Sequence, residues 1–378
     1  MSILQQPRKK WKYKINSFPE PYRTLYTLLN RQGYILVGRH SVVKKCHWTH
    51  VSLTEGRYCY KCKFYGIESH RDIQMSPAAL WCWNACIHCW RLRPTDTIKW
   101  DDTKLPWVDD PELIAEGSIE AYKDTLMGYW GHPKIKDNPT LRKKLEEALN
   151  PVHVAISLTG EPLLYPRIGE LVEEYHRRGF TTFLVTRGIR PDVLAEMEEE
   201  PTQLYVSIEA WDKESYEYFD KPLVPRAWEL NMKTIELLPT FSSMTTIRFT
   251  IIRRFNMHNK ALKKWAKMVE IAQPTYIEVK SYMHVGASRQ RLSRNDMLRH
   301  IEILDLAKKL ADLTGYNIVS HQVESRVVLL SRLNKPIRVG KGCPETENDK
   351  EEVDLVVEAL EKGKLDDVEY MLISKNKI

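Results

Sequence analysis

The sequence predicts an α/β protein whose central part is a partial, TIM-like (β/α)6 barrel. Short apolar or β-branched runs, typical of buried strands, alternate with amphipathic helical stretches along the middle of the chain. Residues 295–313 show the helical pattern well, because Met297, Ile301 and Leu304 recur every three to four positions. Six strand-helix repeats predict a curved sheet of parallel strands with helices outside. The predicted strands lie near residues 79–82, 152–158, 181–186, 204–208, 245–252 and 276–281.

The two ends of the chain differ from this pattern. The first 75 residues are basic and rich in cysteine and aromatic residues, with the run Arg8 to Lys14 as a possible arm for phosphates or a disordered tail. Past Arg326 the pattern fades, and residues 340–344 look like a turn into an acidic tail. Val353, Val356 and Leu360 follow helical spacing, which predicts an appended helix there. The expected parts are residues 1–75, 76–325 and 326–378.

Composition narrows the class of protein. A chain of 378 residues with 43% hydrophobic content can bury a large core. No apolar run is long enough for a membrane span and the N-terminus does not look like a signal peptide, so we expect a cytoplasmic protein. Residues 345–369 hold eleven acidic residues against three lysines, which leaves +15 on the rest of a chain with a net charge of +7. Such a basic body suits a polyanion with stackable bases, although plain solvated charge is the alternative.

Three cysteines, Cys82, Cys86 and Cys89, stand within eight residues at the end of the first predicted strand. Thiolates select iron–sulfur clusters, zinc or Cu(I). Tetrahedral zinc sites usually close with a second pair of ligands, and this CxxxCxxC motif has none nearby. A cubane cluster held by three thiolates leaves one iron open, which the amino and carboxylate groups of S-adenosylmethionine (SAM) can chelate. Zinc or buried free thiols are the plainer readings.

A second set of three cysteines lies upstream, at Cys46, Cys59 and Cys62. It is embedded in basic and aromatic residues, including Lys44 and Lys45. A zinc site completed by a nearby histidine or by Cys343 fits the spacing as well as a second iron–sulfur cluster does.

Polar residues also follow the predicted strands, where active residues of such barrels lie. Thr159 to Pro162 follow the second strand, Thr186 ends the third, and Ser207 and Glu209 close the fourth. The sixth strand runs into a loop with aromatic and basic residues that suits a nucleotide and its phosphates, or else is merely solvated. The loop residues with these side chains are Tyr282, His284, Arg289 and Arg291. Each strand-end residue taken singly could be a turn or capping residue.

The CxxxCxxC motif resembles the signature of the radical SAM superfamily, and the turn Thr159 to Pro162 resembles that family's Gly-Gly-Glu-Pro turn with Thr in the first place. The resemblance implies a 4Fe-4S cluster on Cys82, Cys86 and Cys89 that binds and reduces SAM. It also implies that His88 flanks the adenine. The residues it places around SAM are His88, Gly160, Glu161, Thr186, Ser207 and Glu209.

From about residue 33 to residue 343 the chain also resembles the archaeal form of the tRNA 4-demethylwyosine synthase family, enzymes of wyosine biosynthesis. The resemblance implies a second 4Fe-4S cluster on Cys46, Cys59 and Cys62. It implies a lyase acting on tRNA-Phe with N1-methylguanosine at position 37, with pyruvate as the source of two carbons. An external electron donor such as ferredoxin or flavodoxin would be needed, and we expect a monomer.

Two ways of holding pyruvate remain open. The open iron of the second cluster could chelate it, which is the favoured reading, or a lysine could form a Schiff base with its ketone. Lys44 and Lys45 are candidate contacts to pyruvate or phosphate, and Lys61, Lys63 and Lys280 are further candidates for the amine. The alternative functions are a radical SAM activase or methylthiolating enzyme, and a zinc-containing RNA-binding protein.

Overall fold

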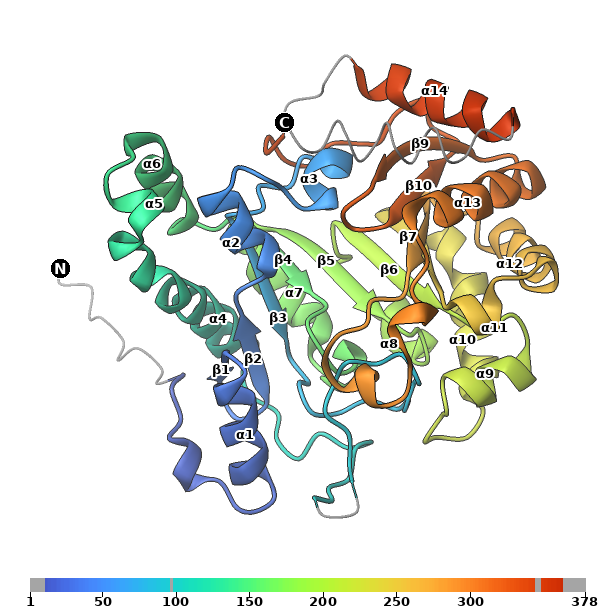
Figure 1. Cartoon of the computed structure of the whole chain (residues 1–378). Helices are drawn as coiled ribbons and strands as arrows, with labels where there is room; N and C mark the ends of the chain where they lie inside the picture. Colours follow the sequence, from blue (N-terminus) through green and yellow to red (C-terminus); the bar gives the residue numbers. More distant parts are fainter. Residues whose placement is uncertain (1–10, 96–97, 344–347, 363–378) are drawn as a thin grey trace. The chain divides into compact units, whose positions relative to one another are not determined.

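The computed structural model describes residues 11–95, 98–343 and 348–362 (Figure 1). The chain divides into two compact units. Unit 1 consists of residues 1–56, 70–82 and 93–182, and unit 2 consists of residues 57–69, 83–92 and 183–378. None of the helices within the described ranges is long and apolar enough to span a membrane.

Unit 1 contains four strands in the order β1-β2-β3-β4. The first two pairs are antiparallel and β3 pairs with β4 in parallel. The strand bounds are β1 Tyr34–Val37, β2 Ser41–Lys44, β3 Asp72–Ser76 and β4 His153–Ile156. Its α-helices are α1 Tyr22–Arg31, α2 His47–Thr54, α4 Pro111–Leu126, α5 Pro133–Lys136, α6 Pro139–Ala148 and α7 Ile168–Arg177. Helix α4 begins where Asp110 accepts a hydrogen bond from the N–H of Glu112, with Pro111 in the first turn.

Unit 2 receives the chain within strand β5 (Thr181–Thr186) and has the strand order β5-β6-β7-β8-β10-β9. Strands β5 to β8 are parallel, and β10 lies antiparallel between β8 and β9. The bounds are β6 Gln203–Ile208, β7 Met244–Ile251, β8 Tyr276–Ser281, β9 Asn317–Gln322 and β10 Val327–Ser331. Its α-helices are α3 Tyr60–Tyr65, α8 Pro191–Ala195, α9 Lys213–Phe219, α10 Ala227–Leu237, α11 Arg253–Asn256, α12 Asn259–Ala272, α13 His300–Thr314 and α14 Asn348–Glu361.

The predicted α/β class is confirmed, and five of the six predicted strands lie where the sequence placed them, as β4 to β8. The first predicted strand is wrong, because residues 79–82 form a loop and the strand is β3, a few residues earlier. Pro77, which follows β3, cannot donate to a strand ladder. Leu80 and Trp81 are nevertheless completely buried, so a buried loop imitated the apolar run of a strand.

The C-terminal part holds more structure than the fading pattern indicated. Strands β9 and β10 extend the sheet of unit 2, and every residue of β10 is buried. The predicted tail helix is confirmed as α14, in which Val353 and Val356 are buried. Residues 8–10 of the basic arm and parts of the acidic stretch 345–369 lie outside the described residues. The division at residues 75 and 325 stays a prediction and does not coincide with the borders of the two units.

Candidate active site

The turn after β4 in unit 1 is built against the segment that leads to Cys82. Gly160 has a φ of +70°, and a Cβ there would collide with the carbonyl oxygen of Ala78. The N–H of Glu161 donates to the carbonyl of Trp81 at 2.9 Å, and its buried carboxylate accepts from the N–H of Leu163 at 3.1 Å. The close approach requires glycine at position 160. It leaves the turn rigid at the carboxyl end of a parallel strand, where the sequence places part of the SAM site.

The loop from Trp83 to Leu92 in unit 2 carries Cys86 and Cys89. Backbone N–H groups of Ala85 and Ile87 donate to carbonyls at the end of α9, at 3.0 and 2.9 Å. Arg291 donates to the carbonyl of Ile87 at 2.9 Å and to that of Cys89. Cys82 ends its unit-1 segment, and none of the three cysteines of the motif forms a disulfide. An iron–sulfur cluster on these thiols stays a prediction.

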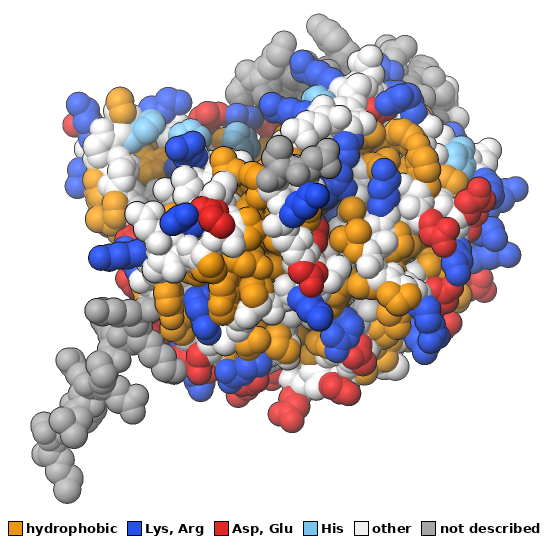
Figure 2. Space-filling model, turned by 90° about the horizontal axis from the view of Figure 1, so that it is seen from below, with side chains coloured by type: hydrophobic (Ala, Val, Ile, Leu, Met, Phe, Trp, Pro, Cys, Tyr) orange, Lys and Arg blue, Asp and Glu red, His pale blue; other side chains and the backbone are white. Residues whose placement is uncertain are grey.

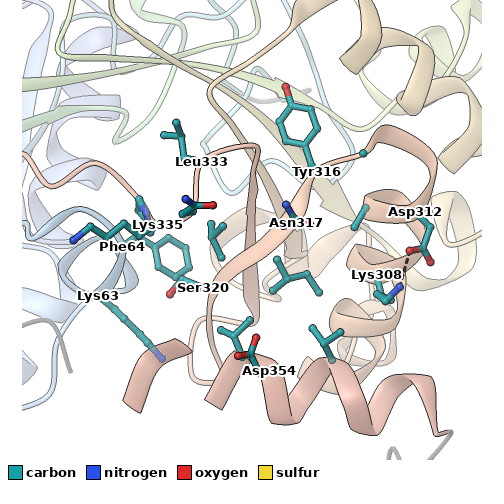
Figure 3. A pocket seen from close by; sticks show the side chains of 18 of the residues that line it. Lys63, Phe64, Lys308, Asp312, Tyr316, Asn317, Ser320, Leu333, Lys335 and Asp354 are labelled. Atoms are coloured by element: carbon teal, nitrogen blue, oxygen red, sulfur yellow. Dashed lines mark hydrogen bonds and ion pairs between the residues drawn. The ribbon is translucent and has the colours of Figure 1, made fainter. Parts of the chain in front are cut away.

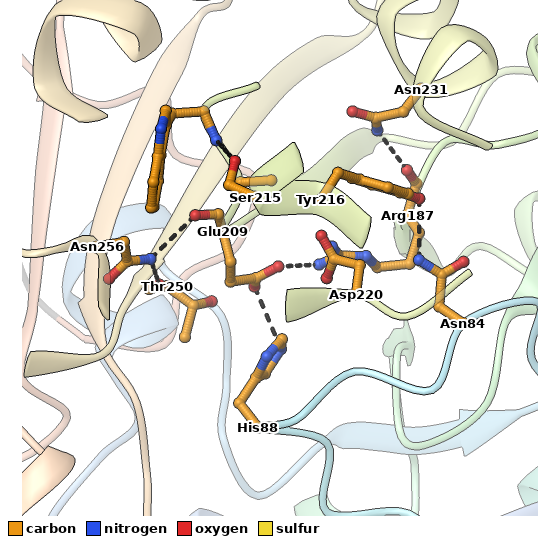
Figure 4. Close-up of polar contacts among 12 residues, drawn as sticks. Asn84, His88, Arg187, Glu209, Ser215, Tyr216, Asp220, Asn231, Thr250 and Asn256 are labelled. Atoms are coloured by element: carbon orange, nitrogen blue, oxygen red, sulfur yellow. Dashed lines mark hydrogen bonds and ion pairs between the residues drawn. The ribbon is translucent and has the colours of Figure 1, made fainter. Parts of the chain in front are cut away.

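A buried charge network in unit 2 lies at the carboxyl ends of β5 and β6 (Figure 4). The guanidinium of Arg187 pairs with the carboxylates of both Glu209 and Asp220, which are almost completely buried. A second oxygen of Glu209 lies 3.3 Å from Nε2 of His88. The side-chain amide of Asn231 donates to the backbone carbonyl of Arg187 at 2.6 Å, which holds the backbone of Arg187 in place. The network therefore holds the predicted adenine-flanking His88 and Glu209 in one arrangement.

The two buried carboxyl groups of this network have pKa values that are shifted in opposite directions. Burial raises the pKa of Asp220 to about 7 even though Arg187 opposes the shift. Burial alone would also raise the pKa of Glu209, but Arg187 and His88 together bring it below its usual value. His88, Glu209 and Asp220 offer ligand atoms within 4.8 Å of one another. Because the guanidinium of Arg187 already pairs with both carboxylates, these residues fit a positioning network better than a cation site.

The second predicted cluster involves α3 of unit 2, with Cys59 as its N-cap and Cys62 inside it. Cys59 forms no disulfide, whereas Cys62 is joined to Cys343 by one. Gly340 and Gly342 donate from their N–H groups to the carbonyls of Tyr65 and Gly66, so this part of the chain lies directly on the end of α3. A disulfide sulfur is not a thiolate ligand, so Cys62 cannot hold the predicted cluster while it is joined to Cys343. Ligation by Cys62 stays a prediction for the reduced protein.

Around α3, unit 2 encloses a second group of buried charges. Arg248 of β7 pairs with the completely buried Glu278 of β8 at 2.8 Å and donates to the hydroxyl of Tyr60 at 3.0 Å. The ammonium of Lys280 lies 4.5 Å from the centre of the Tyr60 ring. Burial lowers the pKa of Lys280 to about 8, with a further contribution from Arg248 and opposition from Glu278. Lys61 also adds to this shift, so the two lysines are near neighbours.

Unit 1 holds the remaining predicted residues of this centre. Cys46 forms no disulfide and is the N-cap of α2. Lys44 lies over the ring of Tyr34 at 4.5 Å, and Lys45 over that of Tyr129 at 4.3 Å. Burial lowers the pKa of both lysines. Their ammonium groups are thus placed on aromatic faces rather than in open solvent.

The predicted tRNA contacts fare differently. Tyr282 packs in a buried cluster with residues such as Ile87 and Phe219, and its hydroxyl lies 2.9 Å from Oγ of Ser288. Enclosed in this way, the ring of Tyr282 shows little surface to solvent, and its contact with tRNA stays a prediction. Arg291 is partly buried and holds the cysteine loop through its two hydrogen bonds, and its contact with tRNA also stays a prediction. Arg289 is exposed and donates to the carbonyl of His284 at 3.2 Å. The contacts of Arg289 and His284 with tRNA stay predictions.

Sequence reasoning missed the charged residues Arg187, Asp220, Arg248 and Glu278. For Arg187, Arg248 and Glu278 the available signal was a charged residue inside or directly after an apolar strand, where burial demands a partner. Asp220 follows helix α9 and gave no such signal. Arg248 stands in the middle of β7 and Glu278 in β8, directly opposite in the parallel register. Only the register reveals that pairing.

A cavity of about 1010 Å³ lies elsewhere in unit 2, bordered by β9, α13 and α14 (Figure 3). Its lining combines Lys63, Lys308 and Lys335 with Asp312 and Asp354. Lys308 pairs with Asp312 at 2.6 Å, so part of this charge is internally matched. None of the described cysteines lines the cavity, and we assign it no part in the chemistry.

Comparison with known proteins adds the family. The model of the radical SAM superfamily matches residues 77–266, and the model for wyosine base formation matches residues 271–332. The S-adenosyl-L-methionine-dependent tRNA 4-demethylwyosine synthase of Pyrococcus abyssi is 47% identical over 86% of this chain and 93% of its own length. The protein of that name from Methanocaldococcus jannaschii is 42% identical over 83% of this chain and 97% of its own. A solved structure of TYW1 with a lysine-pyruvate adduct bound matches with a TM-score of 0.73 and 40% identity, covering 85% of this chain and 99% of that one. The chain therefore has the radical SAM α/β fold and belongs to the family of S-adenosyl-L-methionine-dependent tRNA 4-demethylwyosine synthases.

Proposed function

We propose that this chain converts N1-methylguanosine at position 37 of tRNA-Phe, with pyruvate, into 4-demethylwyosine, and so acts as a lyase in wyosine biosynthesis. The observation that carries the proposal is the 47% identity to a synthase of this name along 86% of the chain. The thiols of Cys82, Cys86 and Cys89, which form no disulfide, support it, because the reaction needs a cluster that three cysteines can hold. An external donor such as ferredoxin or flavodoxin would supply the electron.

The residues divide into those for SAM and those for the second cluster. Cys82, Cys86 and Cys89 would hold the first cluster, and bound SAM supplies, on reduction, a radical that takes hydrogen from the N-methyl group. Cys46 and Cys59 would hold the second cluster, joined by Cys62 once its disulfide is reduced. The rigid turn at Gly160 and Glu161 would accept from the amino group of SAM. His88, Glu209, Thr186 and Ser207 would line the remainder of the cofactor.

For pyruvate, the structure favours a lysine over chelation alone. A relative's structure contains a lysine-pyruvate adduct, and unit 2 offers two enclosed lysines, Lys61 and Lys280, beside Cys59. A neutral amine is the nucleophile, and the pKa of about 8 for Lys280 makes that form accessible near neutral pH. The amine nitrogen attacks the ketone carbon, the carbonyl oxygen leaves as water with both amine protons, and an imine forms. The neighbouring lysine, when protonated, would pair with the carboxylate of pyruvate.

The overall proposal is tested with the anaerobic, cluster-loaded enzyme. Incubated with SAM, a reductant, pyruvate and tRNA-Phe carrying N1-methylguanosine, it should yield a nucleoside with the mass of 4-demethylwyosine, and omission of pyruvate should stop the reaction. An activase or methylthiolating enzyme would instead cleave SAM productively without pyruvate. A colourless protein that contains zinc and lacks the absorbance of iron–sulfur clusters near 400 nm would support the RNA-binding alternative and refute the proposal.

The site of imine formation is tested by trapping. Borohydride added with labelled pyruvate should fix a pyruvate-derived mass on Lys61 or Lys280, and replacing the trapped lysine by Arg should stop product formation. Lys45→Arg is the matched control. In this variant pyruvate should still be trapped on Lys61 or Lys280, and product should still form. Absence of any trapped lysine, together with a pyruvate-dependent change in the spectrum of the second cluster, would favour chelation instead.

A further inference from the structure

A lysine, three histidines and a tyrosine form a cluster in unit 1 that the proposed mechanism does not use. It consists of Lys45, His47, His50, Tyr129 and His132, and is called here the histidine cluster. Tyr129 stands at its centre and is only 6% exposed. Its hydroxyl lies 2.6 Å from Nδ1 of His50, the ammonium of Lys45 lies 4.3 Å from its ring centre, and the ring of His132 stacks on it at 5.8 Å.

The local structure presents these groups together. His47 and His50 stand three residues apart on α2, so they lie on one side of that helix. His132 is the N-cap of α5, and its Nδ1 accepts from the N–H of Lys134 at 3.3 Å. An Nδ1 that accepts a hydrogen bond leaves the proton on Nε2, which makes Nε2–H a donor for an outside acceptor.

The charge of the histidine cluster is one-sided. Burial lowers the pKa of His50, and Lys45, His132 and His47 lower it further, while Glu55 is the acidic residue that opposes them. Burial raises the pKa of Tyr129 to about 12, so its phenol stays neutral and contributes no negative charge. The lowered pKa keeps His50 neutral near pH 7, so the ammonium of Lys45 is the positive group beside Tyr129 with which an anion can pair.

Further cations extend this surface along α5 and α6. Lys134, Lys136, Arg142 and Lys143 are exposed, and the guanidinium of Arg142 lies 5.5 Å from the ring of Trp130. Asp137, which lies 3.6 Å from Lys136, offsets part of this charge. Figure 2 shows histidine side chains gathered at the upper left of the face it draws, beside Lys and Arg side chains. A row of cations suits a chain of phosphates, whereas a single ketoacid carboxylate needs only one or two of them.

We infer that the histidine cluster and the cations that follow it on α5 and α6 form a binding surface for the phosphate backbone of the tRNA, outside the reacting base. The inference rests on the proposed function, which supplies the tRNA. Lys45 and the Nε2–H of His132 donate to phosphate oxygens, while Tyr129 holds both side chains in place. Lys45 thereby serves phosphate and not pyruvate.

The test measures tRNA affinity of the anaerobic, cluster-loaded enzyme. The probe is fluorescently labelled tRNA-Phe carrying N1-methylguanosine, and its dissociation constant is followed by anisotropy at several salt concentrations. His132→Asn keeps a side-chain oxygen for the N-cap but removes the outward donor, and Lys45→Met removes the cation. Each should raise the dissociation constant roughly 3- to 10-fold and reduce the salt slope by about one contact. Lys104→Gln, an exposed lysine elsewhere in unit 1, should change neither.

The readouts separate the possible failures. His132→Asn should leave the iron content and the tRNA-independent cleavage of SAM unchanged, which shows that the fold is intact. Unchanged tRNA affinity in both variants would overturn the assignment of the histidine cluster while product formation by the wild type still upholds the proposed function. A raised KM for pyruvate with unchanged tRNA affinity would also overturn it and make the cluster a ketoacid site. If the wild type neither binds nor converts the tRNA, both the proposed function and this inference fail.

Discussion

Glu278→Gln is expected to destabilise unit 2 strongly, because it leaves a buried guanidinium without its counter-charge. Glu278 is completely buried, and the side chain of its partner Arg248 is 16% exposed. Removing one member of a buried ion pair typically costs 3–5 kcal/mol, and the slight exposure of Arg248 places the expected loss near the lower end, at about 3 kcal/mol. At roughly 2 °C per kcal/mol for a chain of this size, the melting temperature should fall by about 6 °C. Gln keeps an acceptor for the hydroxyl of Tyr65, so the loss reports on the charge.

The assay is thermal unfolding of Glu278→Gln, Arg248→Met and the double variant, arranged as a double-mutant cycle. The double variant should be less destabilised than the sum of the two single ones, since no unpaired charge is left inside it. Glu229→Gln is the matched control: its ion pair with Lys213 is also 2.8 Å long but exposed, so the melting temperature should barely change. Additive effects within about 0.5 kcal/mol would refute the reasoning.

Three further outcomes are expected. Cys343→Ser should retain the iron of the proposed second cluster, about four irons, whereas Cys62→Ser should lose it; equal loss in iron analysis would place Cys343 among the ligands. Lys280→Met should be more stable than the wild type at pH 7, because the folded-state pKa of Lys280, about 8, lies below its unfolded value of about 10.4. The charged lysine therefore destabilises the folded state below pH 8, and the difference in stability should vanish as the pH rises from 8 to about 10.4. A pH-independent difference in melting temperature contradicts this. Gly160→Ala should abolish SAM cleavage, whereas Gly179→Ala, at a φ of +78° but with open space around it, should keep it; equal activity would show that the contact at position 160 is not limiting.

Local patterns were enough to predict most of the parallel strands. Runs such as residues 244–251 contain β-branched and aromatic side chains that suit a pleated, buried surface, and this preference is written in neighbouring residues. The same local pattern gave a wrong strand at residues 79–82, because a buried loop is as apolar as a strand. The pair β9 and β10 was missed because their short segments follow one another without the helix that announces a parallel unit.

Contacts between distant residues were beyond the sequence. Cys62 and Cys343 are 281 residues apart, and cysteine spacing does not determine pairing. The cysteine motif and the turn at Gly160 were recognisable because each is contiguous. The role of Arg187, by contrast, depends on its ion pairs with Glu209 and Asp220, which are distant in the sequence and meet it only in the folded chain. The burial of Tyr282 could not be predicted, because an aromatic residue after a strand looks alike in the sequence whether it faces solvent or the core.

Helix α14 has a consequence for solubility. Strand β9 is the last strand in the order of unit 2, with β10 as its partner, so its outer side is a free template for another chain. Helix α14 lies against β9 and buries Val353 and Val356. A chain that ends before residue 348 would uncover this strand and the apolar side chains beneath the helix, and such shortened protein should self-associate as its concentration rises. Helix α14 would thus protect the protein from aggregation, a function that is independent of radical chemistry and of RNA.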